Sequence, residues 1–280
     1  MDTECIEIFK GKYFDKHHNS RSKKVIAFDL DETLGEFGDL KTLWDLIQKN
    51  KYNIDFQQLV DLYPEFIRYG IFAILEYLLV KKKSGECFRV YIYTNNQSNT
   101  NWVHMLVDYF NNKINRQEKV IDHAICAFKI NNKRIELART SHKKSHTDFI
   151  NCTLLPKSTL ICFLDNTNFE EMQKDRIYYI KPESYRHTLT TQLIVRRIMG
   201  SHLSQYITNK PLFTSEFNRL SVSKGLYKTM NDVSNISLRR NIQISQRIMY
   251  HIRDFFILTY RRKYTRKMKN IPYRHTRKRS

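Results

Sequence analysis

Residues that interrupt regular structure are scarce, with 7 glycines and 5 prolines among 280 residues. This scarcity excludes collagenous sequence, glycine-rich linkers and proline-rich low-complexity segments. Because 41% of the residues are hydrophobic, the chain can bury a sizeable core. We expect a globular protein with one large or two modest domains.

Cysteine is also scarce, and no two cysteines form a Cys-x-x-Cys pair, so neither a disulfide framework nor a zinc site is predicted. The most apolar run, 69–80, is interrupted by Glu76 and is shorter than the roughly 20 residues that a membrane span needs. The first residues are acidic where a signal peptide would be basic. We therefore expect an intracellular protein of the cytoplasm or nucleus that does not interact with membranes.

Acidic residues are almost missing from the C-terminal part of the chain. Residues 201–280 contain 18 Lys and Arg but only 3 Asp and Glu. Residues 1–200 contain 30 Lys and Arg and 25 Asp and Glu. The last twenty residues, 261–280, contain ten Lys and Arg and no acid. We expect this basic segment either to bind nucleic acid nonspecifically or to act as a targeting signal.

Short hydrophobic runs alternate with segments of helical periodicity. Strands are predicted at 25–28, 88–93, 160–164 and 177–180, and helices at 43–48, 56–63, 71–79 and 102–110. This alternation predicts an α/β fold in which helices sandwich a mostly parallel sheet. The predicted organisation is an N-terminal extension (1–23), an α/β domain (24–202), a helical extension (203–260) and a basic flexible tail (261–280).

Polar residues follow three of the predicted strands directly. In parallel sheets of this kind, ligands bind at the carboxyl ends of the strands, so we expect these side chains to meet in one pocket. They are Asp29 and Asp31, Thr94 and Asn95, and Asp165 and Asn166.

The pair Asp29 and Asp31 suggests phosphoryl chemistry. One carboxylate can act as a nucleophile and the other as a general acid and base. Two close carboxylates repel each other unless a cation lies between them, which implies Mg²⁺ with its preference for oxygen ligands. The oxygens of a phosphoryl group need hydroxyl, amide and ammonium donors, and Thr94, Asn95 and a lysine supply these types.

These motifs resemble those of the haloacid dehalogenase superfamily. FDLDETL at 28–34 resembles motif I of one branch of this superfamily. The enzymes of this branch are protein phosphatases that act on the C-terminal domain of RNA polymerase II and on related nuclear-envelope substrates. VYIYT at 90–94 resembles motif II, CFLDNTN at 162–168 resembles the last motif, and Arg68-Tyr69-Gly70 lies where the branch has Arg-Pro-Gly. The resemblance covers about 24–200 and implies a HAD-like, Rossmann-like domain with small cap insertions. It implies a Mg²⁺-dependent phosphatase for phosphoserine or phosphothreonine in proteins.

The resemblance also implies roles for the acidic residues. Asp29 would be the nucleophile that forms an aspartyl-phosphate, and Asp31 would be the general acid and base. Mg²⁺ would be held by the Asp29 carboxylate, the Asp31 carbonyl and Asn166, with Asp165 in the outer shell. Thr33 would orient the loop.

The phosphoryl oxygens would be held by Thr94, Asn95 and a lysine of motif III. Three lysines between motifs II and the last motif are candidates for this position. Lys144 is preferred because it lies 21 residues before Asp165 and precedes a predicted helix; Lys143 and Lys157 follow in that order.

The chain departs from the family at the mouth of the expected pocket. Asn96 and Gln97 follow where small residues are usual, and Thr167-Asn168 replaces Ser-Pro. The substrate therefore stays open, and a polynucleotide or nucleotide phosphatase with the same site is an alternative. A non-catalytic nucleic-acid-binding virion protein is another, since the composition resembles that of proteins from large DNA viruses.

Overall fold

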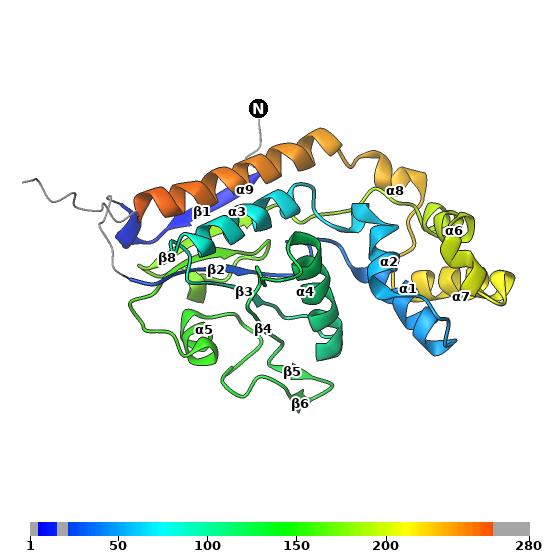
Figure 1. Ribbon diagram of the computed structural model, residues 1–280, viewed down its shortest axis with the longest axis horizontal. Coiled ribbons are helices and arrows are strands. Elements are labelled where there is room, and N and C mark those ends of the chain that lie inside the picture. Colours follow the sequence, from blue (N-terminus) through cyan, green and yellow to red (C-terminus); the bar gives the residue numbers. More distant parts are fainter. Residues whose placement is uncertain (1–4, 16–21, 260–280) are drawn as a thin grey trace, which may run out of the picture.

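The computed structural model describes residues 5–15 and 22–259 and contains a six-stranded sheet in the order β1-β8-β7-β2-β3-β4 (Figure 1). All neighbouring strands are parallel except β1, which pairs with β8 in the antiparallel direction. The strands are β1 (Ile6–Lys10), β2 (Lys24–Phe28), β3 (Arg89–Tyr93), β4 (His123–Ile125), β7 (Leu160–Leu164) and β8 (Ile177–Pro182), and a separate ribbon pairs β5 (Lys129–Ile130) with β6 (Lys133–Arg134).

The helices cover the sheet and form a group at one of its ends. They are α1 (Gly38–Lys49), α2 (Phe56–Asp61), α3 (Ile71–Lys83), α4 (Thr100–Ile114), α5 (His146–Thr153), α6 (Thr191–Gly200), α7 (Lys210–Ser223), α8 (Met230–Ser234) and α9 (Leu238–Leu258). Short 3-10 helices lie at Lys12–Phe14, Pro64–Phe66, Glu170–Met172 and His202–Tyr206. The predicted α/β class, with a mostly parallel sheet between helices, is confirmed.

Strand β2 lies in the middle of the sheet and is buried on both faces. Val25 and Ala27 belong to the core under α5, whereas Ile26 and Phe28 belong to the core under the helices of the opposite face. A parallel strand covered on both sides needs apolar residues at every position, which explains the uninterrupted run VIAF. The acidic residues begin where this cover ends.

Helix α9 lies along β8 and β1 on the same side of the sheet as α3 (Figure 1). Its residues Ile248, Ile252 and Phe255 are buried in the same core as Ile26 of β2. Ile242 is only partly buried, whereas Ile244 lies in the core. Residues 238–258 are therefore a structural layer of the α/β body.

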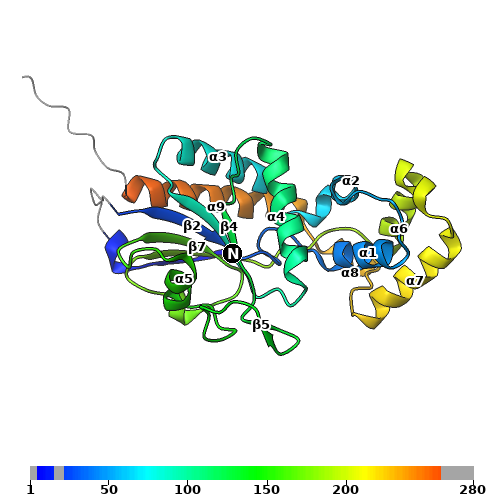
Figure 2. The ribbon, with the colours of Figure 1, turned by 60° about the horizontal axis from the view of Figure 1, so that its bottom comes forward.

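A group of helices lies beyond the carboxyl ends of the parallel strands (Figures 1 and 2). It contains α1 and α2 from the segment after β2 and α6, α7 and α8 from the C-terminal third. Helix α1 packs against α7, and the Tyr63 hydroxyl donates a hydrogen bond of 2.7 Å to the Ile194 carbonyl. Segments far apart in the sequence thus build one lobe next to the predicted pocket.

Two strands of the sheet were not predicted from the sequence. β1 comes from the segment interpreted as an extension, and β4 is only three residues long. Across 5–15 and 22–259, no helix has both the length and the apolar character required to cross a membrane. The predicted tail, 261–280, lies outside the described residues.

Candidate active site

The strand order reverses its direction at β2. From β2 the chain continues to β3 on one side and later returns to β7 on the other. Such a reversal leaves the loops after the central strands apart and is where α/β sheets bind ligands. Asp29, Thr94 and Asp165 each follow one of these three strands, so the topology brings their loops to one edge.

Lys144 joins two of these loops. Its Nζ forms ion pairs with Asp29 Oδ1 and, at 2.6 Å, with Asp165 Oδ2. The Lys144 side chain is 2% exposed, whereas Lys143 and Lys157 are exposed at the surface. Helix α5 begins just after Lys144, where the Ser145 side chain accepts a hydrogen bond from the Asp148 N–H and caps the helix. Of the three candidate lysines, Lys144 is therefore the one at the acidic cluster.

Thr33 and Asn166 connect the loop after β2 to the loop after β7. The Thr33 hydroxyl donates to Asn166 Oδ1 at 3.0 Å and accepts from the Asn166 N–H at 3.1 Å. The Asn166 amide nitrogen donates to the Ser184 hydroxyl at 2.9 Å. The Asn166 oxygen therefore contacts Thr33 of the loop that contains the two aspartates, and the Asn166 nitrogen also donates to Glu32 Oε2 of this loop at 3.3 Å.

Asp31 is linked to the loop after β3 through Asn96. The Asn96 Nδ2 donates to Asp31 Oδ2 at 2.7 Å, and the Asn96 N–H donates to the Thr94 hydroxyl oxygen at 3.0 Å. Burial, and then the negative charge of Asp29, raise the pKa of Asp31 to about 6, although the Asn96 bond opposes this rise. A carboxyl group with such a pKa can exchange a proton near neutral pH.

Asn95 is not placed where the sequence predicted it. Its Nδ2 donates to the His142 carbonyl at 2.7 Å, and its Oδ1 accepts from Arg139 at 2.7 Å. The amide that contacts the acidic cluster belongs to Asn96 instead. Successive side chains in an extended segment point to opposite sides, and the sequence Asn-Asn gave no indication of which one faces the acids.

Two buried arginines support the site and were not predicted as functional. Arg68 donates from Nε to the Thr33 carbonyl at 2.6 Å and from Nη2 to the Glu32 carbonyl at 2.7 Å. Arg139 is fully buried and donates to the Thr94 carbonyl at 2.9 Å. The Arg-Tyr-Gly motif was a signal for Arg68, but no sequence pattern distinguishes Arg139 from a surface arginine.

The acidic cluster contains more negative than positive groups. Three carboxylates (Asp29, Asp31 and Asp165) are accompanied by a single ammonium group, that of Lys144. Burial raises the pKa of Asp165 above its ordinary range, the charge of Lys144 opposes this rise, and the charge of Asp29 adds to it. No group of three His, Cys, Asp or Glu side chains that could hold a metal occurs within the described ranges. A cation would therefore also require the Asn166 amide oxygen and the Asp31 carbonyl.

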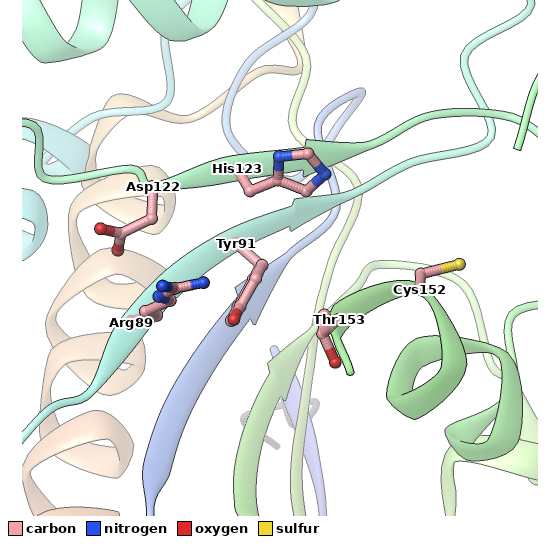
Figure 3. A pocket seen from close by; sticks show the side chains of 6 residues that line it. All are labelled: Arg89, Tyr91, Asp122, His123, Cys152 and Thr153. Atoms are coloured by element: carbon pink, nitrogen blue, oxygen red, sulfur yellow. The ribbon is translucent and has the colours of Figure 1, made fainter. Parts of the chain in front are cut away.

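Two cavities lie on the α5 side of the sheet. One, of about 330 Å³, adjoins the acidic cluster and is lined by Lys143, Lys144, Asn168, Phe169, Glu170 and Glu171. The other, of about 350 Å³, lies at the amino ends of β3 and β4 and is lined by Arg89, Tyr91, Asp122, His123, Cys152 and Thr153 (Figure 3). Its acid, Asp122, is paired with Lys82 at 2.8 Å, so this second cavity holds no free carboxylate for catalysis.

Comparison of the chain with family models, with curated proteins and with solved structures gives no match.

Proposed function

We propose that the protein is a Mg²⁺-dependent phosphatase of the haloacid dehalogenase type that acts on phosphoserine or phosphothreonine in proteins. The observation that carries this proposal is the position of Lys144 between Asp29 and Asp165, with Asp31 beside them at the ends of the central strands. Nucleophile, proton donor and phosphate-binding cation are the three groups that phosphomonoester hydrolysis requires.

In the first step, an Asp29 carboxylate oxygen attacks the phosphorus atom and the bond from phosphorus to the substrate oxygen breaks. Asp31 transfers its proton to the departing oxygen, so that an alcohol is released. In the second step, Asp31 takes a proton from a water molecule, whose oxygen attacks the aspartyl-phosphate. The bond between Asp29 and phosphorus then breaks, and inorganic phosphate leaves.

The surrounding groups stabilise charge during both steps. Lys144 already contacts Asp29 and supplies a positive charge for the phosphoryl oxygens. The Thr94 hydroxyl accepts from Asn96 and keeps its own proton available for donation to a phosphoryl oxygen. Asn96 replaces Asn95 as the amide at this position.

The residues present fit Mg²⁺. The Asp29 carboxylate, the Asp31 carbonyl and the Asn166 amide oxygen would hold it, and Thr33 fixes the orientation of Asn166. Asp165 uses one oxygen for Lys144 and accepts from the Thr167 N–H at 2.8 Å with the other, which suits a supporting position outside the metal ligands. The bound cation would neutralise charge on the phosphoryl oxygens.

A protein substrate is favoured over a polynucleotide by the charges beside the cluster. Glu170 and Glu171 line the cavity next to Lys144, both are exposed, and neither forms an ion pair with any residue of the described ranges. A polynucleotide would bring additional phosphates close to these carboxylates, whereas a phosphopeptide can present a single phosphate.

Hydrolysis of an aryl phosphate in the presence of Mg²⁺ tests the reaction. We expect Asp29→Asn to abolish turnover, because the amide cannot form the covalent intermediate, while Asp108→Asn, an exposed change on α4, keeps wild-type activity. Retained activity in Asp29→Asn would refute the role of Asp29. A phosphopeptide and a 3′-phosphorylated oligonucleotide at equal concentration then distinguish the two substrate classes, and faster hydrolysis of the oligonucleotide would reject the protein substrate.

A further inference from the structure

The outer face of α9 forms a continuous polar stripe that faces away from the sheet. Taking 100° per residue, the exposed side chains that follow Leu238 fall within a sector of about 120°, and the stripe is about 27 Å long. These residues are Arg239, Gln243, Gln246, Arg247, Tyr250, Arg253 and Ile257, and we call them the α9 stripe.

The charge of the α9 stripe is entirely positive. None of Arg239, Arg247 and Arg253 forms an ion pair with a carboxylate in the described part of the chain. Arg247 donates to Cys5 Sγ at 3.8 Å, and Arg253 lies over the Tyr77 ring at 5.4 Å. The only acid of the helix, Asp254, is already paired with Lys10 at 2.7 Å. The positive charges of these three guanidinium groups are therefore not neutralised by a carboxylate of the described residues, and an external anion can pair with them.

The spacing along the stripe suits a repeating anion. The axial separation is about 12 Å between Arg239 and Arg247 and about 9 Å between Arg247 and Arg253. Tyr250, between the last two arginines, is 65% exposed and presents an aromatic ring on the same face. Cations at intervals with an aromatic ring between them are the elements by which proteins hold single-stranded nucleic acid.

The sequence after α9 continues the same charge. Residues 261–280, which directly follow the helix and Thr259-Tyr260, contain ten Lys and Arg and no acid. A membrane is a poorer match for this face, because the apolar residues of α9, such as Ile248 and Phe255, are buried against the sheet and cannot enter a bilayer.

We propose that the α9 stripe is a binding surface for single-stranded nucleic acid. Arg239, Arg247 and Arg253 pair with backbone phosphates, and Tyr250 stacks on an unpaired base. This surface is separate from the acidic cluster and does not depend on the phosphatase activity. The nucleic acid is bound there and is not the substrate.

The test measures binding of a fluorescent 20-nucleotide single strand to the full-length protein over a range of salt concentrations. The variant Arg239→Gln/Arg247→Gln/Arg253→Gln should reduce the slope of log affinity against log salt by about 2, because about 0.7 counterions are released per neutralised phosphate. The matched control Arg116→Gln/Arg196→Gln/Arg219→Gln removes the same charge from exposed positions elsewhere and should keep the wild-type slope.

Tyr250→Ala provides a second, uncharged test. Loss of one stacking contact should weaken binding about 5- to 100-fold and leave the salt slope unchanged. A wild-type slope in the triple α9 variant, wild-type affinity in Tyr250→Ala, or equal losses in the Arg116 control would each overturn the proposal. Binding of anionic vesicles or an acidic peptide in place of the oligonucleotide would also overturn it. Aryl phosphate hydrolysis, measured in parallel, reports the proposed activity independently.

Discussion

Lys144 is the single residue on which the electrostatics of the acidic cluster depend. Its ammonium group is buried with two carboxylates, those of Asp29 and Asp165, and water cannot replace it. A buried charge that loses its partner is strongly destabilising, since the attraction that offset its desolvation disappears. The residue that we propose for phosphate binding therefore also contributes to stability.

We expect Lys144→Met to lower the free energy of unfolding at pH 7 by about 3–5 kcal/mol. The neighbouring exposed change Lys143→Met should alter it by less than about 0.5 kcal/mol. Chemical denaturation of both variants measures the difference. Similar values for the two variants would show that Lys144 is not needed to neutralise the buried carboxylates.

Asn96 should set the pH dependence of the proposed reaction. As the proton donor, Asp31 acts in its protonated form, so the rate of the first step should fall as the pH rises through its pKa of about 6. The Asn96 bond stabilises the carboxylate and lowers this pKa, so Asn96→Ala should move the fall in rate to higher pH. Asn95→Ala, which changes an amide that points away from Asp31, should not.

The pH profile of aryl phosphate hydrolysis under single-turnover conditions measures this shift. A profile that moves equally in Asn95→Ala and Asn96→Ala, or a shift to lower pH, would contradict the assignment.

Among the elements, α5 is short but critical, because it begins at the cap that places Lys144. The helix ends at Thr153, and the next residue, Leu154, adopts left-handed backbone angles (φ 53°) and is 89% exposed. At such angles the Cβ atom lies too close to the backbone. Glycine has no Cβ atom, which is why it is common at this position. The leucine side chain at this position contributes little packing to compensate.

Replacing Leu154 by glycine should therefore stabilise the protein. We expect a gain of about 1 kcal/mol and a rise of about 2–4 °C in the melting temperature. Leu137→Gly is the matched control, since Leu137 is 77% exposed but has no positive φ, and it should give no gain. Calorimetry of the two variants compares them directly, and a loss of stability in Leu154→Gly would argue against strain at this helix end.

At the scale of the whole molecule, a buried ionic cluster joins the loop after β2 to the C-terminal third. Glu36 accepts from the His187 N–H and from Lys228 Nζ, both at 2.8 Å. The His187 imidazole lies 2.9 Å from Asp39 through Nε2. The lobe of helices beyond the sheet is thus connected through charged groups to the loop that contains the proposed nucleophile.

Glu36 should make the stability of this connection pH-dependent. Burial alone would raise its pKa, but His187 and Lys228 outweigh burial and hold the pKa below its ordinary value of 4.5. A group with a lowered folded-state pKa stabilises the protein above its unfolded-state pKa, and this contribution is lost as the pH falls through the folded-state value.

We therefore expect Glu36→Gln to lower the free energy of unfolding by about 1.5–3 kcal/mol at pH 7. The difference from wild type should shrink as the pH is lowered below 4.5. Glu76→Gln, on the exposed face of α3, is the control and should have little effect at either pH. Urea denaturation at pH 7 and pH 4 measures both, and a pH-independent difference for Glu36→Gln would reject the linkage.

The sequence alone determined the central part of the fold and the identity of most polar residues at its edge. Apolar runs with acids directly after them define where β2 and β7 end, because a buried strand cannot contain unpaired carboxylates. The 21-residue spacing of Lys144 and Asp165 was enough to rank Lys144 first. These features are determined by residues that are close together in the sequence, and local sequence patterns can therefore predict them.

Only the tertiary structure decided which side chains reach the acids and how the C-terminal third packs. The choice of Asn96 over Asn95 depends on the direction of a loop, which is fixed by Arg139 and the His142 carbonyl more than forty residues away. The burial of α9 depends on β1 and β8, which its own amphipathic pattern cannot identify. Contacts between remote segments decided both outcomes, and a short window of sequence contains no information about them.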